Sequence, residues 1–231
     1  MIEKIVRFNK VVSTQDTAKA FIEEKRSLAV TALSQYRGRG RQGRTWHSPQ
    51  GGLYVSLLLF PEERVTSIPL LAALSVVRTL EELGMSRLTI HWPNDVLLGN
   101  KKVCGILCER YRSSVICGVG LNVNSGKIGH RLENATSLRL ETGRDFDIDE
   151  ILGFFLRKFN ELYEELQSKG LKVKEVLNYI SGLGEPVEII TQHGVIRGTV
   201  SDIDDDWALL LRDESGIIKK YYYGDVRRMQ W

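Results

Sequence analysis

The sequence predicts an α+β fold, in which a mixed β-sheet with helices packed on one side is followed by a small C-terminal β-barrel. Apolar strand-like runs succeed one another along most of the chain, interrupted by two long amphipathic helical patterns. After Gly182 and Gly184 only short β-runs remain. We therefore expect two domains, formed by residues 1–183 and by residues 184–231.

Apolar periodicity gives the elements of the first domain in chain order. Strands are expected at residues 5–12, 28–33, 53–60, 88–92, 96–98, 102–109 and 115–123. Helices are expected from Ser13-Thr14 onward and over residues 69–83, 147–167 and 173–180. Ser13 and Thr14 favour a helix start, Gly84 favours a helix end, and Gly99-Asn100 favours a hairpin turn.

The second domain shows a different pattern, with short β-runs and no helical periodicity. Four of the runs span residues 187–191, 195–203, 208–212 and 217–223. We expect five short strands in fewer than fifty residues, which is typical of a small barrel.

The composition is that of an ordinary globular protein. Of the 231 residues, 42% are hydrophobic, which is enough for a sizeable core. The net charge of +3 is too mild for a dedicated nucleic-acid binder. Neither a signal peptide nor a bilayer-length apolar run is present, so we expect a cytoplasmic protein. The three cysteines lie in apolar runs and are expected to be buried free thiols.

Residues 37–44 read Arg-Gly-Arg-Gly-Arg-Gln-Gly-Arg, and we call them the arginine loop. Each of its four guanidinium groups can donate two hydrogen bonds to a carboxylate or a phosphate. The loop lacks the Gly-Lys-Ser/Thr of a P-loop and the spacing of a dinucleotide-binding fingerprint. Taken alone, it fits a small-anion site, a nucleic-acid contact or a solvated basic loop.

Two motifs further along the chain could serve the same ligand. Trp92-Pro93-Asn94-Asp95 ends a strand in a rigid turn. Its carboxylate could hold Mg²⁺ for a nucleotide, or the pair Asn94-Asp95 could only cap the turn. Lys102 stands at the start of an apolar strand. Its charge could attract an anion, or it could prevent the edge of the sheet from pairing with another chain.

Two neutral motifs leave similar alternatives. Gly118 and Gly120 interrupt the apolar strand that ends at Asn122, which indicates either a closely approaching ligand or a bulge. The cluster Ser13-Thr14-Gln15 is a helix cap, and such a cluster can also hold a polar ligand.

Taken together and in order, these motifs resemble the biotin protein ligases, also called biotin–[acetyl-CoA-carboxylase] ligases. The ordered motifs span about residues 13–138, and the C-terminal runs fit the family's C-terminal domain, an SH3-like barrel. The resemblance rests on Ser13, Thr14, Gln35, the arginine loop, Trp46, residues 92–95, Lys102, residues 105–107 and residues 118–122.

The resemblance implies a two-step reaction in a catalytic, biotin- and ATP-binding domain of residues 1–183. The carboxylate of biotin attacks the α-phosphate of ATP and forms biotinyl-5′-AMP and pyrophosphate. A specific lysine of a biotin carboxyl carrier protein, a subunit of acetyl-CoA carboxylase, then takes the biotinyl group. Mg²⁺ is the expected cofactor, and a sheet edge could support a homodimer. Neither DNA nor a membrane is an expected partner.

The resemblance also implies roles for single residues. Lys102, Arg41 and Arg39 are expected to be catalytic, because positive charge stabilises the reacting phosphorus. The expected biotin-binding residues are Ser13, Thr14, Gln15, Gln35, Gly38, Arg39, Gly40, Arg41, Lys102, Gly105, Gly118 and Gly120. The expected ATP-binding residues are Arg41, Gln42, Arg44, Trp46, Asn94, Asp95, Lys102 and Asn122, with Asp95 as the magnesium ligand. The arginine loop is expected to close over the reactive adenylate as a lid.

Three positions depart from the family pattern. Gln42 stands where arginine is frequent, His91 where lysine or arginine is common, and Gln15 where asparagine is often found. Because the motifs begin within the first dozen residues or so, we expect a monofunctional ligase without the DNA-binding domain that some members carry. The rival interpretations are a lipoate–protein ligase or octanoyltransferase-like acyl transfer, a nucleic-acid-binding module, and an inactive biotin binder.

Overall fold

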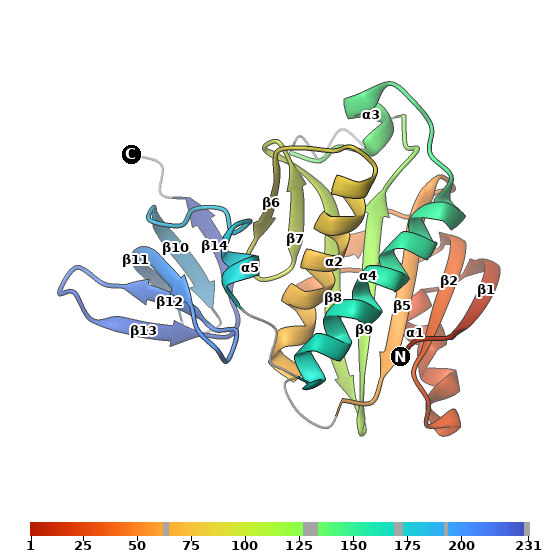
Figure 1. Ribbon diagram of the computed structural model, residues 1–231, viewed down its shortest axis with the longest axis horizontal. Coiled ribbons are helices and arrows are strands. Elements are labelled where there is room, and N and C mark those ends of the chain that lie inside the picture. Colours follow the sequence, from red (N-terminus) through yellow and green to blue (C-terminus); the bar gives the residue numbers. More distant parts are fainter. Residues whose placement is uncertain (62–64, 127–133, 169–172, 192–193, 229–231) are drawn as a thin grey trace.

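The structure is a computed structural model that describes residues 1–61, 65–126, 134–168, 173–191 and 194–228. A seven-stranded sheet with helices forms the larger part, and a five-stranded antiparallel sheet forms the smaller part (Figure 1). The strand order in the larger sheet is β1-β2-β5-β9-β8-β7-β6. Only the β1–β2 pairing is parallel, so this sheet is mixed, as predicted.

The predicted elements are found with small shifts in their ends. The strands of the larger sheet are β1 (Lys4–Val11), β2 (Leu28–Gln35), β5 (Gly52–Leu59), β6 (Leu88–His91), β7 (Asp95–Leu98), β8 (Lys101–Tyr111) and β9 (Ser114–Asn122). The helices are α1 (Thr14–Ala18), α2 (Ile68–Glu82), α3 (Leu138–Thr142), α4 (Ile148–Ser168) and α5 (Lys174–Leu177), with 3-10 turns η1 (Lys19–Glu24) and η3 (Val65–Ser67). Helix α5 is shorter than predicted, and α3 was not predicted.

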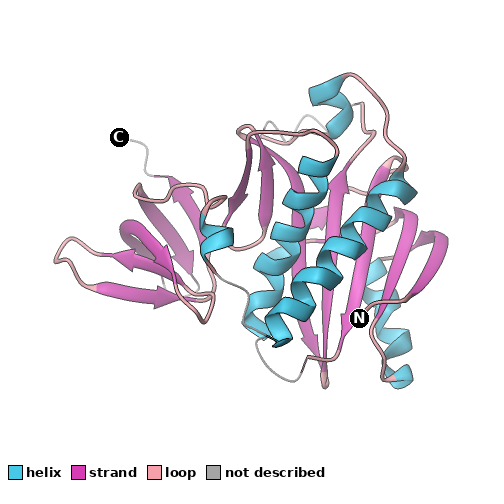
Figure 2. Ribbon diagram, in the orientation of Figure 1, coloured by secondary structure: helices cyan, strands magenta, loops and turns pink. Residues whose placement is uncertain are grey.

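The two long helices lie on one face of the sheet, as predicted (Figure 2). Strand alternation sends Leu53, Val55 and Leu57 of β5 into the same core as Phe155 and Phe159 of α4. Each of these side chains is at most 1% exposed. Full burial of one such side chain contributes about 1.5–3 kcal/mol, so this layer supplies most of the hydrophobic stabilisation.

The opposite face of the sheet has a smaller apolar cluster, in which Ala18 of α1 packs with Leu28, Val30, Leu58 and Ile116. The short helix α1 therefore lies across the sheet from α2 and α4. Polar residues and the glycines of β8 and β9 occupy a neighbouring part of this face.

The smaller sheet has the strand order β13-β12-β11-β10-β14 and matches the antiparallel C-terminal unit that was predicted. Its strands are β10 (Pro186–Thr191), β11 (Gly194–Ile203), β12 (Leu209–Arg212), β13 (Ile218–Tyr221) and β14 (Asp225–Arg228). Its apolar residues continue the core of the larger part. His91 of β6 joins the two sheets, because its Nε2 donates to the carbonyl oxygen of Val226 at 2.8 Å.

Two further expectations concern cysteines and membranes. The three cysteines are free thiols, and burial is the main cause that raises the pKa of both Cys104 and Cys108. Cys104 and Cys117 are buried, whereas Cys108 is half-buried. Across the described ranges, no helix combines the length and the apolar character needed to cross a bilayer.

Candidate active site

A pocket of about 280 Å³ lies on the face of the large sheet opposite α2 and α4. Its floor is made by Gly105 of β8 and by Gly118 and Gly120 of β9. Strand β9 pairs with both neighbours without a shift in register, so these glycines do not mark a bulge. A Cβ atom on Gly120 would lie 2.4 Å from Nε1 of Trp46, which shows how closely another group approaches the strand.

One end of the pocket is neutral and is built from Ser13 and Thr14 at the start of α1. Gln35 accepts from the backbone N and from Oγ1 of Thr14, at 2.8 and 3.2 Å. Ser56 of β5 donates to Oγ1 of Thr14 at 2.9 Å. Ser13 stands at the N-cap position, but its hydroxyl makes no capping bond and has no partner among the described residues, although the residue is only 1% exposed. This hydroxyl is therefore available to a polar ligand.

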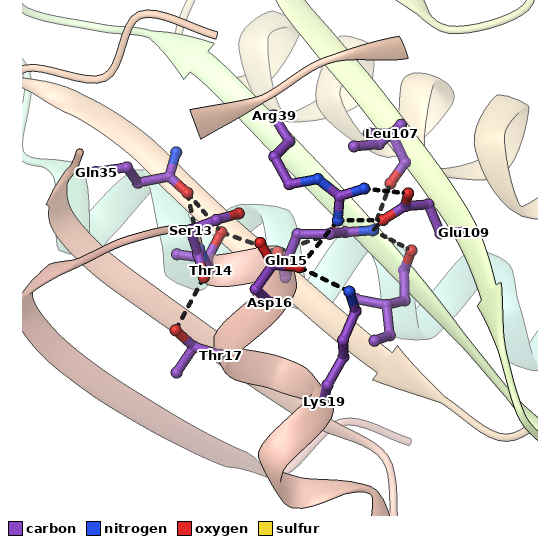
Figure 3. Close-up of polar contacts among 12 residues, drawn as sticks. Ser13, Thr14, Gln15, Asp16, Thr17, Lys19, Gln35, Arg39, Leu107 and Glu109 are labelled. Atoms are coloured by element: carbon purple, nitrogen blue, oxygen red, sulfur yellow. Dashed lines mark hydrogen bonds and ion pairs between the residues drawn. The ribbon is translucent and has the colours of Figure 1, made fainter. Parts of the chain in front are cut away.

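Gln15 ties this neutral end to the sheet (Figure 3). Its Nε2 donates to the carbonyl oxygen of Ile116 at 2.8 Å and lies 3.3 Å from that of Leu107 and 3.2 Å from Oε2 of Glu109. Its Oε1 accepts from Ser56 at 3.1 Å. Because both atoms of the amide are bound to the protein, Gln15 positions the site rather than offering a free group to a ligand.

The arginine loop and the two residues after it form a small hairpin, in which β3 (Gly38–Arg39) pairs with β4 (Thr45–Trp46). The turn η2 (Arg41–Gly43) lies between them and holds Gln42 at a φ of 54°. Trp46 extends from this hairpin over the glycine floor. Its Nε1 is buried without a partner in the described part of the chain, and Nζ of Lys102 lies 5.4 Å from its ring centroid.

Arg39 is held by two carboxylates at the α1 side of the pocket (Figure 3). Its Nη1 and Nη2 donate to the two oxygens of Glu109 at 2.8 and 2.5 Å, and Nη1 also reaches Asp16 at 3.0 Å. Burial lowers the pKa of Arg39, but the bonds to Glu109 and the charge of Asp16 outweigh burial and raise this pKa. The guanidinium is therefore a fixed cation.

Arg41 and Arg44 converge on Asp225 of β14, a residue that the motifs did not reveal. Arg44 lies 2.5 Å and Arg41 3.3 Å from its carboxylate oxygens. Arg41 also donates to Oδ1 of Asn94 and to the carbonyl oxygen of Gly224. The C-terminal sheet thus supplies one wall of the charged end of the pocket.

The turn of residues 92–95 supplies the other wall. Asn94 donates to Oδ1 of Asp95 at 2.8 Å and to the carbonyl oxygen of Ile106 at 3.2 Å. Nζ of Lys102 lies 2.6 Å from Oδ2 of Asp95, so lysine and carboxylate form one ion pair at the centre of the pocket. In the described ranges no three His, Cys, Asp or Glu side chains converge as a metal cage.

The structure brings nearly all predicted site residues to this pocket. Those that line it are Ser13, Thr14, Gln15, Gln35, Arg39, Gly40, Arg41, Arg44, Trp46, Asn94, Asp95, Lys102, Gly105, Gly118, Gly120 and Asn122. Gly38 and Gln42 are not among the lining residues. Gly38 instead packs against Ser48 and Trp46, and the exposed Gln42 accepts from Arg44 at 2.9 Å. Ser56 and Asp225 line the pocket and were missed, because neither belongs to a recognisable motif.

Known proteins resemble both parts of the chain. Residues 8–124 match the Biotin/lipoate A/B protein ligase family, and residues 182–228 match the Biotin protein ligase C terminal domain. The bifunctional ligase/repressor BirA of Bacillus subtilis (strain 168) is 34% identical over an aligned length of 242, and the alignment covers 98% of this chain and 74% of that protein. The biotin--[acetyl-CoA-carboxylase] ligase of Paracoccus denitrificans is 32% identical over 82% of this chain and 86% of its own length.

A solved structure extends the likeness to the whole fold. The biotin protein ligase from Aquifex aeolicus in complex with biotin and ATP superposes with a TM-score of 0.89 at 33% sequence identity. The likeness covers 99% of this chain and 100% of that one.

Proposed function

The chain belongs to the biotin/lipoate A/B protein ligase family, and from this premise we propose that its pocket joins biotin to ATP and passes the biotinyl group to a carrier lysine. The chain is a biotin protein ligase, an ATP-dependent enzyme. The observation that carries the proposed chemistry is the pocket itself, in which a neutral end and a cationic end meet at Lys102. The C-terminal domain match and the names of the relatives favour biotin over lipoate.

We assign catalysis to residues 1–183 and a supporting role to residues 184–231. The match to the C-terminal domain begins at residue 182, close to this boundary. The contacts of Asp225 with two loop arginines support a role for the smaller domain in ATP binding.

We assign the bicyclic ring of biotin to the neutral end. Its ureido group is an uncharged donor and acceptor, which suits the buried hydroxyl of Ser13. The hydrogen bonds of Thr14, Gln15 and Gln35 fix the start of α1, where Ser13 lies, against the sheet. Because Gly105, Gly118 and Gly120 have no side chains, Trp46 and Gln15 can lie close to the strands and leave space beside them for the ring. Gly38 and Gly40 let the hairpin approach this space.

We assign the phosphates to the cationic end. The reaction brings a carboxylate against a polyphosphate, so both reactants are anions and need positive charge at the reacting phosphorus. Lys102 is the group that we place nearest the biotin carboxylate and the α-phosphate, with Arg41 and Arg39 supporting it. The remaining nucleotide contacts are assigned to Gln42, Arg44, Trp46, Asn94 and Asn122, with Trp46 stacking on the adenine.

We expect Mg²⁺ to enter with ATP, held chiefly by the phosphates, with Asp95 as one protein ligand. Asp95 offers a single carboxylate, and its oxygens also contact Lys102 and Asn94, so the protein can supply few ligands and the phosphates and water would supply the rest. When bound, the ion would neutralise charge on the leaving pyrophosphate.

We infer the partners from the same reaction. A biotin carboxyl carrier protein would present its lysine to the adenylate, in the cytoplasm and without DNA. A homodimer would form through the edge strand β1, because the other edge, β6, pairs through Ile90 with Ile180 and contacts the C-terminal sheet through His91. Sedimentation at several protein concentrations tests this inference.

The test of the reaction is intact-mass spectrometry of a carrier domain incubated with the protein and MgATP. With biotin we expect one added biotinyl group, and omission of ATP should abolish it. A parallel incubation with lipoate should leave the carrier unchanged. Modification by lipoate but not by biotin would overturn the proposal in favour of the lipoate reaction.

The lid function of the arginine loop has its own test. Trypsin cleaves after arginine, so the loop offers its own cleavage sites. Biotin and ATP together should slow cleavage between residues 37 and 44. Equal cleavage rates with and without them would show that the loop does not close.

A further inference from the structure

Glu109 lies where three separate elements of the pocket meet (Figure 3). It stands on β8, while Gln15 stands on α1 and Arg39 on the hairpin. Its Oε2 accepts from Nη1 of Arg39 at 2.8 Å and from Nε2 of Gln15 at 3.2 Å, and its Oε1 accepts from Nη2 of Arg39 at 2.5 Å. One carboxylate therefore joins the neutral end of the pocket to the arginine loop.

We propose that Glu109 is a positioning residue that keeps the hairpin closed over the adenylate by coupling Arg39 to Gln15. Glu109 is not among the residues that line the pocket, so it acts through these two side chains and not by touching a ligand. The inference rests on the proposed function, since it concerns how long biotinyl-5′-AMP is retained.

The geometry distinguishes this contact from an ordinary surface ion pair. An exposed pair with a single contact contributes little, because water screens it and two flexible side chains must be ordered. Here the guanidinium fork meets both carboxylate oxygens, an arrangement that fixes orientation as well as distance. Each of the two side chains is only about one third exposed, at 35% and 31%.

The neighbouring carboxylate provides a natural contrast. Asp16 also contacts Arg39, but through one oxygen only, which it shares with Nζ of Lys19 at 2.7 Å. Among the described residues, the carboxylate of Asp16 contacts Lys19 and Arg39 but no residue of β8 or β9, and so it does not connect the hairpin to the sheet. Asp16→Asn is therefore the matched control, since it removes a charge beside Arg39 and leaves the coupling in place.

The consequence for the reaction follows from the position of Arg39 at the base of the hairpin, where Arg39 pairs with Thr45. If Arg39 is released from β8, the whole hairpin loses its attachment at this side. The adenylate would then escape to water before an acceptor lysine reaches it. Loss of this charged contact predicts a roughly tenfold faster release of adenylate, which corresponds to about 1.4 kcal/mol.

The experiment measures release of preformed adenylate. The protein is loaded with labelled biotin and MgATP, diluted into unlabelled biotin, and sampled by rapid filtration. Glu109→Gln should speed release about tenfold and should lower the rate constant of adenylate formation by about threefold or less. Asp16→Asn should stay within about twofold of the wild type in both measurements.

A double-mutant cycle separates coupling from simple damage. If Glu109 acts through Arg39, the variant carrying Arg39→Gln and Glu109→Gln should release adenylate no faster than Arg39→Gln alone. Additive effects would overturn the proposal. Slower release by Glu109→Gln would also overturn it, because the carboxylate would then hold Arg39 away from the ligand.

Two further controls keep the outcome clear. Glu109→Asp, which retains the charge on a shorter side chain, should give an intermediate release rate if positioning is the role, and a rate equal to that of Glu109→Gln would contradict it. A wild-type protein that forms no biotinyl-5′-AMP would contradict the proposed function. A wild type that forms it and a Glu109→Gln variant that retains it equally well would contradict only the present inference.

Discussion

The two ends of the pocket differ in charge and in exposure to water. The neutral end consists of hydroxyls and amides with little exposure, and Ser13, Thr14 and Gln15 are 1%, 4% and 3% exposed. The charged end consists of ion pairs at the surface of the sheet, and the side chain of Arg44 is 62% exposed. The neutral end is supplied by α1, β2 and β5, whereas the charged end draws on the hairpin, β7, β8 and β14.

The difference teaches how one pocket can accept two unlike substrates. Neutral groups can be buried at moderate cost when they are hydrogen-bonded, so the neutral end can be rigid and shaped to its ligand. Buried charges are costly to desolvate, so the loop arginines stay near water and pair with carboxylates that hold their side chains in position. We therefore expect substitutions at the two ends to affect different substrates.

The largest effect is expected where the two ends meet. Lys102→Ala removes the ammonium group that we place at the reacting phosphorus, and the rate constant of adenylate formation should fall about 100- to 1000-fold. The measurement is quenched-flow detection of biotinyl-5′-AMP. Lys101→Ala is the matched control, because Lys101 precedes it on β8 but is exposed and pairs with Glu141. An equal loss in both variants would contradict the assignment of Lys102 to the reacting phosphorus.

The floor shared by both ends is the next most sensitive part. The Cβ of Gly120→Ala would lie 2.4 Å from Nε1 of Trp46, so the indole must shift, and kcat/KM for biotin should fall about 10- to 100-fold. Gly153→Ala is the control. Gly153 is exposed within α4 and its Cβ would meet nothing within 4 Å, so this change should stabilise the fold by about 0.5–1 kcal/mol and leave kcat/KM unchanged. Unchanged kcat/KM in Gly120→Ala would contradict a role for the close contact between Trp46 and β9 in shaping the pocket.

Substitutions of two serines test the neutral end, because one hydroxyl is hydrogen-bonded to the protein and the other is not. Ser13→Ala should raise KM for biotin about tenfold without lowering the melting temperature, because the hydroxyl has no partner among the described residues. Ser56→Ala should instead lower stability by about 1–3 kcal/mol, because Ser56 bonds both Thr14 and Gln15. A loss of stability in Ser13→Ala with an unchanged KM would mean that its hydroxyl serves the fold.

The smallest effect is expected at the exposed, charged end. Asp225→Asn frees Arg41 and Arg44 from the carboxylate that aims them, and KM for ATP should rise about three- to fivefold while KM for biotin stays constant. In the wild type, KM for ATP should also rise with salt more steeply than KM for biotin, because exposed charges are screened. A fall in KM for ATP in Asp225→Asn would show that this carboxylate competes with phosphate.

Much of the fold and of the pocket could be predicted because the relevant signals are local. The spacing of Ile151, Phe155 and Phe159 predicts the buried stripe of α4, and all three residues are buried. The glycines of β9 predict a close approach, and the register of the sheet excludes the alternative of a bulge. The motifs that the sequence offers in order contain most of the residues that line the pocket.

What could not be predicted depends on contacts between distant parts of the chain. Asp225 lies 181 residues beyond Arg44, and nothing in its local sequence marks it as a partner. Glu109 belongs to an alternating strand in which its carboxylate has no special spacing. Gln15 looks like a capping residue until the structure shows its amide bound to the backbone of Ile116. The sequence also gives no sign that the arginine loop is a hairpin, because β3 and β4 have only two residues each.

The contact between Asp225 and the arginine loop has a consequence for how the protein is made. A ribosome delivers the chain from its N-terminus, so Ser13, Gln35 and the arginine loop emerge long before β14. Until residue 225 has left the ribosome, Arg41 and Arg44 lack the carboxylate that holds them in the finished fold. The neutral end can therefore form during synthesis, whereas the phosphate end is completed only as the last strand of the C-terminal sheet is added.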